Sequence, residues 1–150
     1  FLSWYASSPP DVGIQTSAVL SSAQNGAELI LAGQEYYIEN PNKAGNGALM
    51  RTGPVALSAL GDRKAVAENA AAIAALTHAH PDSTTACVLW SLAIEEAIMT
   101  TETNEVFDWE RAVKSGSEIS SQKKLIFFCF WNNPKSQFKA LTELIFPLLN

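Results

Sequence analysis

Apolar residues recur with helical spacing along the first hundred positions, and turn-forming residues separate the runs. The clearest run follows Pro81, and its three-and-four spacing predicts a helix that buries one broad face. Asp62 follows Gly61 and is the predicted N-cap of the preceding helix. Few segments show strand alternation, so the predicted class is all-α, a compact orthogonal multi-helix bundle of antiparallel hairpins. The predicted buried faces are Ala86, Leu89, Trp90, Ala93, Ile94, Ala97 and Ile98 in the later helix, and Ala65, Val66, Asn69, Ala72, Ile73 and Leu76 in the earlier one.

Breaker residues divide the chain before these helices. Asp11, after two prolines, is the predicted N-cap of a helix that ends at Asn25-Gly26. That helix carries Ile14, Ala18, Val19 and Ala23 on its predicted apolar stripe. A second helix is predicted over 27–39, before an Asn-Pro-Asn breaker. A third apolar stretch covers 48–60, and Pro54 inside it predicts a kink or a restart near Gly53.

The last third of the chain has weaker patterns. Residues 100–105 predict a polar loop, 107–114 a short helix, and 115–122 a Ser/Gly-containing linker. The aromatic run 125–131 fits a buried helix or a strand, because its periodicity does not distinguish the two. Residues 138–149 again favour a helix.

Size and charge restrict the class of protein. The 150 residues, 47% hydrophobic and 17% charged, suit one globular domain spanning 1–150. A net charge of −5 without a basic cluster argues against a nucleic-acid partner. No apolar run is long enough to cross a bilayer, and no signal peptide opens the chain, so we expect no membrane association.

Cysteine use and the first residue add two further expectations. Cys87 and Cys129 lie in apolar surroundings and predict buried free thiols, which indicates a reducing compartment and a cytoplasmic protein. Because the chain starts at Phe1 rather than Met, we expect it to be part of a longer protein.

Polar and backbone-permissive residues concentrate in the segment Gly45-Asn46-Gly47, followed by Arg51. Glycine can adopt positive φ and lets the main chain approach a ligand closely. A loop in this position would lie at a helix N-terminus, which suits an anion such as phosphate. A plain interhelical turn is the alternative interpretation of the glycines. Arg51 could contact a phosphate, or pair with a carboxylate of the next helix.

The two histidines flank the following turn. His78 ends one helix, where it could donate to a ligand or interact with the helix C-terminus. His80 is better explained as a capping or solvent-facing residue. The pair Glu95-Glu96, like the other carboxylates, predicts a solvated helix face. No nucleophile has a base beside it, so no residue is assigned as catalytic.

Three segments, in this order and spacing, resemble the ADP-ribosylglycohydrolase family. They are FLSWYASSPPDVGIQTSAVL, AGNGALMRTGPVAL and LTHAHPDSTTACVLWSLAIEEAI. The resemblance covers residues 1–112, whereas the tail 115–150 departs from the family pattern. The chain therefore looks like one incomplete domain of this family.

The resemblance implies an all-α fold around a cleft that holds two divalent metal ions, usually magnesium or manganese. Enzymes of this family cleave the bond between ribose C1 and a protein side chain or another acceptor, and release ADP-ribose. By resemblance, Gly45, Asn46, Gly47 and His78 would contact ADP-ribose, and Arg51 is a candidate beside them. The implied partners are ADP-ribose or an ADP-ribosylated protein.

The chain departs from the family in its metal ligands. The family binds its metals through a Thr-Asp-Asp cluster and an Asp-Thr-Asp cluster, and this sequence contains neither. We therefore expect the chain alone to be inactive, as the middle of a hydrolase. The alternatives are a non-catalytic ADP-ribose-binding protein and a crystallin-like structural protein. If apolar faces in 81–99 lack their usual cover, the chain should self-associate.

Overall fold

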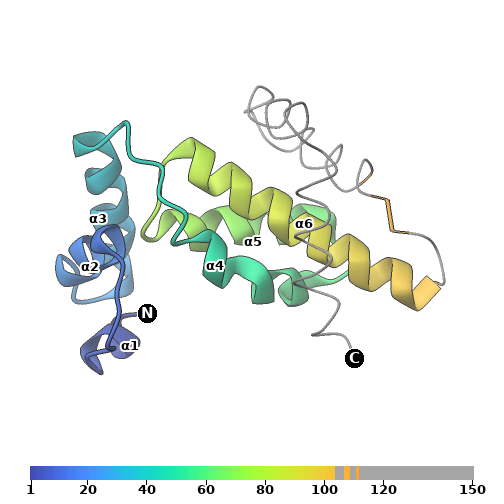
Figure 1. Ribbon diagram of the computed structural model, residues 1–150, viewed down its shortest axis with the longest axis horizontal. Coiled ribbons are helices and arrows are strands. Elements are labelled where there is room, and N and C mark those ends of the chain that lie inside the picture. Colours follow the sequence, from blue (N-terminus) through green and yellow to red (C-terminus); the bar gives the residue numbers. More distant parts are fainter. Residues whose placement is uncertain (104–106, 109–110, 112–150) are drawn as a thin grey trace.

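The computed structural model describes residues 1–103, 107–108 and 111, and all regular structure in this part of the chain is helical (Figure 1). The all-α prediction is therefore confirmed. The helices are α1 (Leu2–Ala6), α2 (Ile14–Ser21), α3 (Gly26–Glu39), α4 (Leu49–Thr52), the 3₁₀ helix η1 (Gly53–Ala59), α5 (Arg63–Ala75) and α6 (Pro81–Thr103).

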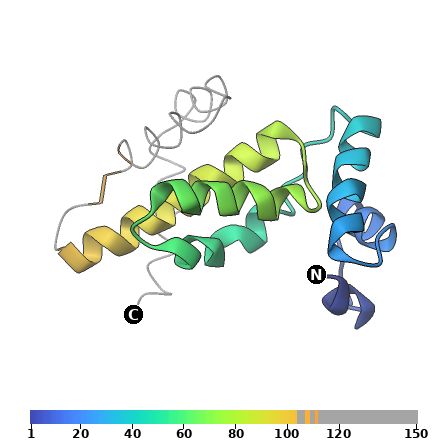
Figure 2. The ribbon, with the colours of Figure 1, turned by 180° about the vertical axis from the view of Figure 1, so that it is seen from behind.

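The helices form two groups. Helices α1 to α3 pack together at one end of the molecule, and α4, η1, α5 and α6 lie side by side next to them (Figures 1 and 2). Helix α3 runs across the direction of α5 and α6, as an orthogonal bundle requires. The turn between α5 and α6 faces the first group (Figure 2). The segment 40–48 is the covalent link between the two groups.

Capping side chains set the starts of two helices. Asn25 accepts the backbone N–H of Glu28 (3.0 Å), and the Glu28 carboxylate accepts the N–H of Gln24 (2.7 Å), so both side chains hold the start of α3. Asp62 accepts the N–H of Ala65 (3.0 Å), so the predicted cap of α5 is confirmed. The predicted cap of α2 is wrong, because that helix begins after Gly13 without a side-chain cap, beyond Asp11.

The predicted break near Gly53 is confirmed. Helix α4 ends at Thr52, and Pro54 occupies the first turn of η1, where its missing N–H costs nothing. The apolar stretch 48–60 is thus a single α-helical turn followed by a 3₁₀ segment.

The predicted buried faces of the two long helices are only partly correct. On α5 the buried residues are Val66, Ala67, Ala70 and Ala74, whereas Asn69 and Ala72 are exposed. Alanines on several sides of α5 make its apolar stripe ambiguous, and the position of its neighbours decides which side is buried. On α6 only Ala93 of the predicted face is fully buried, and the fully buried apolar residues beside it are Cys87, Val88 and Leu92.

Buried charges explain part of this difference. Glu95 and Glu96 are 2% and 4% exposed, so the prediction that they lie on a solvated face is wrong. Arg63 Nη1 contacts both carboxylates, at 2.8 and 2.6 Å, and Arg111 contacts Glu96 from the other side. Buried carboxylates need such partners, because an unpaired buried charge is strongly destabilising. The hydrophobic pattern of α6 could not show that its core-facing side carries charge.

Helix α6 also extends further than predicted. Thr100 is buried within it and donates to the carbonyl of Glu96, so the loop predicted over 100–105 begins no earlier than residue 104. Cys87 is a buried free thiol, as predicted. The predictions for Cys129, the linker 115–122, the aromatic run 125–131 and the helix 138–149 lie outside the described residues. Of the predicted helix 107–114, only residues 107, 108 and 111 are described.

Large apolar side chains that remain exposed lie mainly away from residues 81–99. No large apolar side chain of 81–99 is among them, so the uncovered face expected there is not seen, and self-association stays a prediction. The exposed apolar side chains are Phe1, Trp4, Ile14, Ile30, Leu31, Ile38, Met50, Leu57 and Leu60.

No helix in the described part of the chain combines the length and apolarity needed to cross a membrane.

Gly33 allows the two helical groups to touch. A Cβ at this position of α3 would lie 2.6 Å from the carbonyl oxygen of Ala75 and 2.9 Å from that of Leu76. Such distances are far inside van der Waals contact with backbone atoms that cannot rotate away. The end of α5 therefore packs directly on the backbone of α3.

We expect Gly33→Ala to lower the free energy of unfolding by about 1–3 kcal/mol, because the added methyl group forces α3 away from α5. Urea unfolding followed by circular dichroism measures this change. Gly26→Ala is the matched control, since a Cβ there meets nothing within 4 Å. Its effect should stay within about 0.5 kcal/mol, and equal effects of the two substitutions would contradict the packing argument.

Candidate functional site

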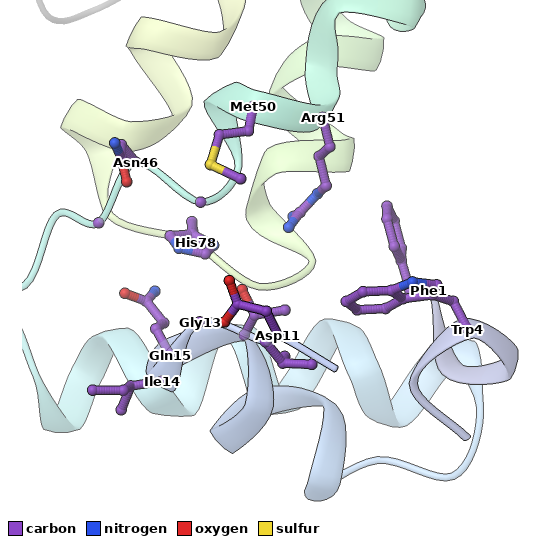
Figure 3. Close-up of a pocket in the computed structure, with 14 residues that line it drawn as sticks. Phe1, Trp4, Asp11, Gly13, Ile14, Gln15, Asn46, Met50, Arg51 and His78 are labelled. Carbon is purple, nitrogen blue, oxygen red and sulfur yellow. The ribbon is translucent and has the colours of Figure 1, made fainter. Parts of the chain in front are cut away.

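A cavity of about 780 Å³ lies between the two helical groups (Figure 3). One wall comes from α1 and the start of α2, and the other from the segment 45–51 and the turn after α5. All the site residues predicted from the sequence line this cavity. The lining residues are Phe1, Trp4, Asp11, Val12, Gly13, Ile14, Gln15, Thr16, Gly45, Asn46, Gly47, Met50, Arg51 and His78.

The two glycines of the loop are required by His78 rather than by backbone conformation. Among the glycines of the described residues, only Gly61 has a positive φ, so Gly45 and Gly47 do not use the positive φ that glycine allows. A Cβ on Gly45 would lie 3.2 Å from His78 Nε2, and one on Gly47 only 3.0 Å from it. Ser83 fixes the loop from behind by donating to the carbonyl of Gly45 (3.0 Å).

The predicted helix N-terminus does not contribute an anion site. Helix α4 has only four residues, and the N–H groups of Leu49 and Arg51 already donate to the carbonyls of Asn46 and Ala48. One turn of helix also has a much smaller dipole than the long helix assumed from the sequence.

Arg51 supplies positive charge to the cavity. Its Nη2 donates to Thr77 Oγ1 (2.6 Å) and to the carbonyl of Ile73 (3.3 Å), and its guanidinium lies 4.8 Å from the centre of the Phe1 ring. No carboxylate among the described residues pairs with Arg51. The alternative of a salt bridge to the next helix is therefore not observed. Burial lowers the pKa of Arg51, but an arginine still carries its charge at neutral pH.

His78 lies at the end of α5, and its ring lines the cavity. Its backbone N–H donates to Ala74 (2.9 Å). The ring Nδ1 lies 2.8 Å from Thr77 Oγ1, and the residue is 2% exposed. Burial, with a smaller effect of the Arg51 charge, lowers the pKa of His78 to about 4. The imidazole is therefore neutral at pH 7.

His80 has the capping role predicted for it. Its Nδ1 accepts the backbone N–H of Asp82 (3.1 Å) in the first turn of α6. Its ring makes an edge contact with Tyr37 and does not line the cavity.

The N-terminal wall of the cavity contains none of the site residues predicted from the sequence. Gln15 reaches from α2 and donates to the carbonyl of Thr77 (2.8 Å), and Asp11 points its carboxylate into the cavity (Figure 3). Phe1 and Trp4 line the same side and are each 46% exposed. The Pro-Pro-Asp-Val-Gly break marked this segment only as a helix boundary. Nothing local in the sequence indicates that it meets a turn some sixty positions away.

The described residues do not form a metal site. No group of three or more His, Cys, Asp or Glu side chains in residues 1–103, 107–108 and 111 is placed to hold a metal ion. The carboxylates that do cluster, Glu95 and Glu96, are neutralised by arginines. These residues do not fit the pair of divalent ions that the family resemblance implies, and we derive no step through a metal.

The depressed pKa of His78 predicts an acid-sensitive contribution to stability. Its ordinary value of 6.5 falls to about 4 on folding, so between these values the unfolded chain binds more protons. The contribution is complete above pH 6.5 and is lost as the pH falls toward 4, in total about 3 kcal/mol. Urea unfolding at several pH values should show a steeper loss for the wild type than for His78→Gln. Identical pH slopes for the two proteins would contradict this assignment.

Comparison with known proteins gives one match. The family model described as ADP-ribosylglycohydrolase matches residues 1–143, past the point where the three sequence motifs end. No curated protein and no solved structure matches this chain significantly. The matched range includes every residue that lines the cavity. The chain therefore belongs to the ADP-ribosylglycohydrolase family.

Proposed function

We propose that the cavity binds ADP-ribose through Gly45, Asn46, Gly47, Arg51 and His78, and that this chain is the ligand-binding part of an ADP-ribosylglycohydrolase. The observation that carries the proposal is the convergence of these residues on one cavity. They come from two segments about thirty positions apart, and the fold joins them at the end of α5. Family membership supplies the ligand class.

The chemistry of the cavity suits a diphosphate with uncharged ends. Arg51 offers a half-buried positive charge in a chain whose net charge is −5. His78 adds a neutral ring whose Nε2 faces the glycine loop. Apart from the carboxylate of Asp11 and the amide of Gln15, the rest of the lining is mainly apolar, with Phe1 and Trp4 on the far wall, and suits sugar and base surfaces. The volume of about 780 Å³ lies within the range typical of sites for ligands of this size.

For the described part of the chain we propose ligand binding and not hydrolysis. Hydrolysis in this family is expected to need divalent ions, and the described residues offer no cage for them. A non-catalytic ADP-ribose-binding protein and a crystallin-like structural protein remain alternatives to a hydrolase segment. A structural protein needs no ligand, so ADP-ribose affinity separates it from the other two.

We expect isothermal titration calorimetry to detect ADP-ribose binding to the wild-type chain. His78→Gln should weaken this binding about tenfold or more, because it removes a ring packed against Gly45 and Gly47. His80→Asn is the matched control, since asparagine preserves a cap for α6 and His80 lies outside the cavity.

Two results would contradict the binding proposal. One is a folded wild-type chain that does not bind ADP-ribose at millimolar concentration. The other is an equal loss of affinity in the two histidine variants, because this would place the ligand elsewhere or indicate a general loss of structure.

We further expect no release of ADP-ribose when the chain is incubated with an ADP-ribosylated protein and magnesium or manganese. No two aspartates in the sequence are adjacent or separated by one residue, so the two aspartate clusters of the family are missing. Chromatography of the released nucleotide measures this. A metal-dependent turnover that EDTA abolishes would show that the chain does build a metal site.

A further inference from the structure

Thr77 links the cationic and the neutral group of the cavity. Its Oγ1 lies 2.6 Å from Arg51 Nη2 and 2.8 Å from His78 Nδ1. Thr77 is completely buried and His78 is 2% exposed. The hydrogen bond between Thr77 and His78 is therefore buried, whereas the one from the half-buried Arg51 is partly buried.

The direction of both hydrogen bonds follows from what each group can do. A guanidinium only donates, so Thr77 Oγ1 accepts from Arg51 and keeps its own hydrogen for donation. Within the described part of the chain, the other partner of this oxygen is His78 Nδ1. If Nδ1 carried the hydrogen, the threonine hydrogen would be buried without an acceptor, which costs about 1–3 kcal/mol. Nδ1 is therefore the acceptor, and the ring hydrogen is on Nε2.

The ring nitrogen that carries the hydrogen, Nε2, lies on the side of His78 that faces the glycine loop of the cavity. Nε2 lies against the loop, 3.2 Å from the place of a Cβ on Gly45 and 3.0 Å from that on Gly47. The glycines leave this edge of the ring uncovered where a side chain would close it. A hydrogen on Nε2 thus turns His78 into a donor at the ligand side of the ring.

Thr77 cannot easily move out of this arrangement. Its carbonyl accepts from Gln15 Nε2 (2.8 Å), and its N–H donates to Ala74 (3.3 Å). Arg51 is held by a second bond to the carbonyl of Ile73 (3.3 Å). The backbone of Thr77 is therefore held in place. The hydroxyl hydrogen can still rotate about the Cβ–Oγ1 bond, and this rotation selects its acceptor.

We infer that Thr77 is a positioning residue: polarised by Arg51, it holds His78 in the Nε2–H tautomer and so presents one neutral donor to an acceptor oxygen of the ligand. The identity of that oxygen, a phosphate oxygen of ADP-ribose, rests on the proposed function. The tautomer itself is a property of the ligand-free chain. The arrangement favours ligand groups that only accept hydrogen bonds, as phosphates do.

Nitrogen-15 NMR of histidine-labelled protein tests the inference without ligand, because protonated and unprotonated ring nitrogens differ strongly in chemical shift. The chain has two histidines, and His80→Asn assigns their signals. For His78 in the wild type we expect an unprotonated Nδ1 and a protonated Nε2. Thr77→Val should give a mixture of tautomers, and Thr77→Ser, which retains the hydroxyl, should restore the wild-type spectrum.

Affinity for ADP-ribose provides the second readout. Thr77→Val should weaken binding about five- to tenfold, and Thr77→Ser should stay within about twofold of the wild type. A wild-type spectrum with a protonated Nδ1, or a Thr77→Val spectrum unchanged from the wild type, would overturn the inference. If Thr77→Val does not fold, the wild-type spectrum alone still decides the tautomer. A wild type with the expected tautomer but no ADP-ribose affinity supports the inference and contradicts the proposed function.

Discussion

The end of helix α5 sets the constraint on which the rest of the site depends. A helix leaves its last carbonyl groups without partners inside the helix, and buried carbonyls need donors from elsewhere. Here the donors come from distant segments: Arg51 reaches the carbonyl of Ile73, and Gln15 reaches that of Thr77 in the following turn. A cation at this end also complements the helix dipole. Satisfying the end of one helix thereby brings α2, the glycine loop and His78 to one place.

Local signals in the sequence predicted the helical class, the cap at Asp62 and the break near Gly53, because each depends on a few neighbouring residues. They did not predict which sides of α5 and α6 are buried. Helix α5 is rich in alanine, which fits a core or a surface equally well, so the packing of neighbouring helices decides. The burial of Glu95 has no local signal, because it depends on the ion pair with Arg63, thirty-two positions away.

The glycine loop, Arg51 and His78 were found because motif order links them to a family, and the fold does bring them together. The physical reason given for them from the sequence was partly wrong. The loop does not open a long helix, and its glycines make room for an imidazole instead of adopting positive φ. The opposite wall, with Gln15, has no local signature, since its role exists only through contact with Thr77.

The placement of the cavity between two helical groups has a consequence for the order of folding. Helices α5 and α6 are neighbours in sequence and can pair early, whereas the bond between Gln15 and Thr77 closes a separation of 62 positions. The cavity is therefore complete only after the N-terminal group has docked. A ligand held by both walls stabilises that docked state by mass action, at the expense of partly open forms of the chain. Ligand occupancy then also reports the last step in the assembly of the domain.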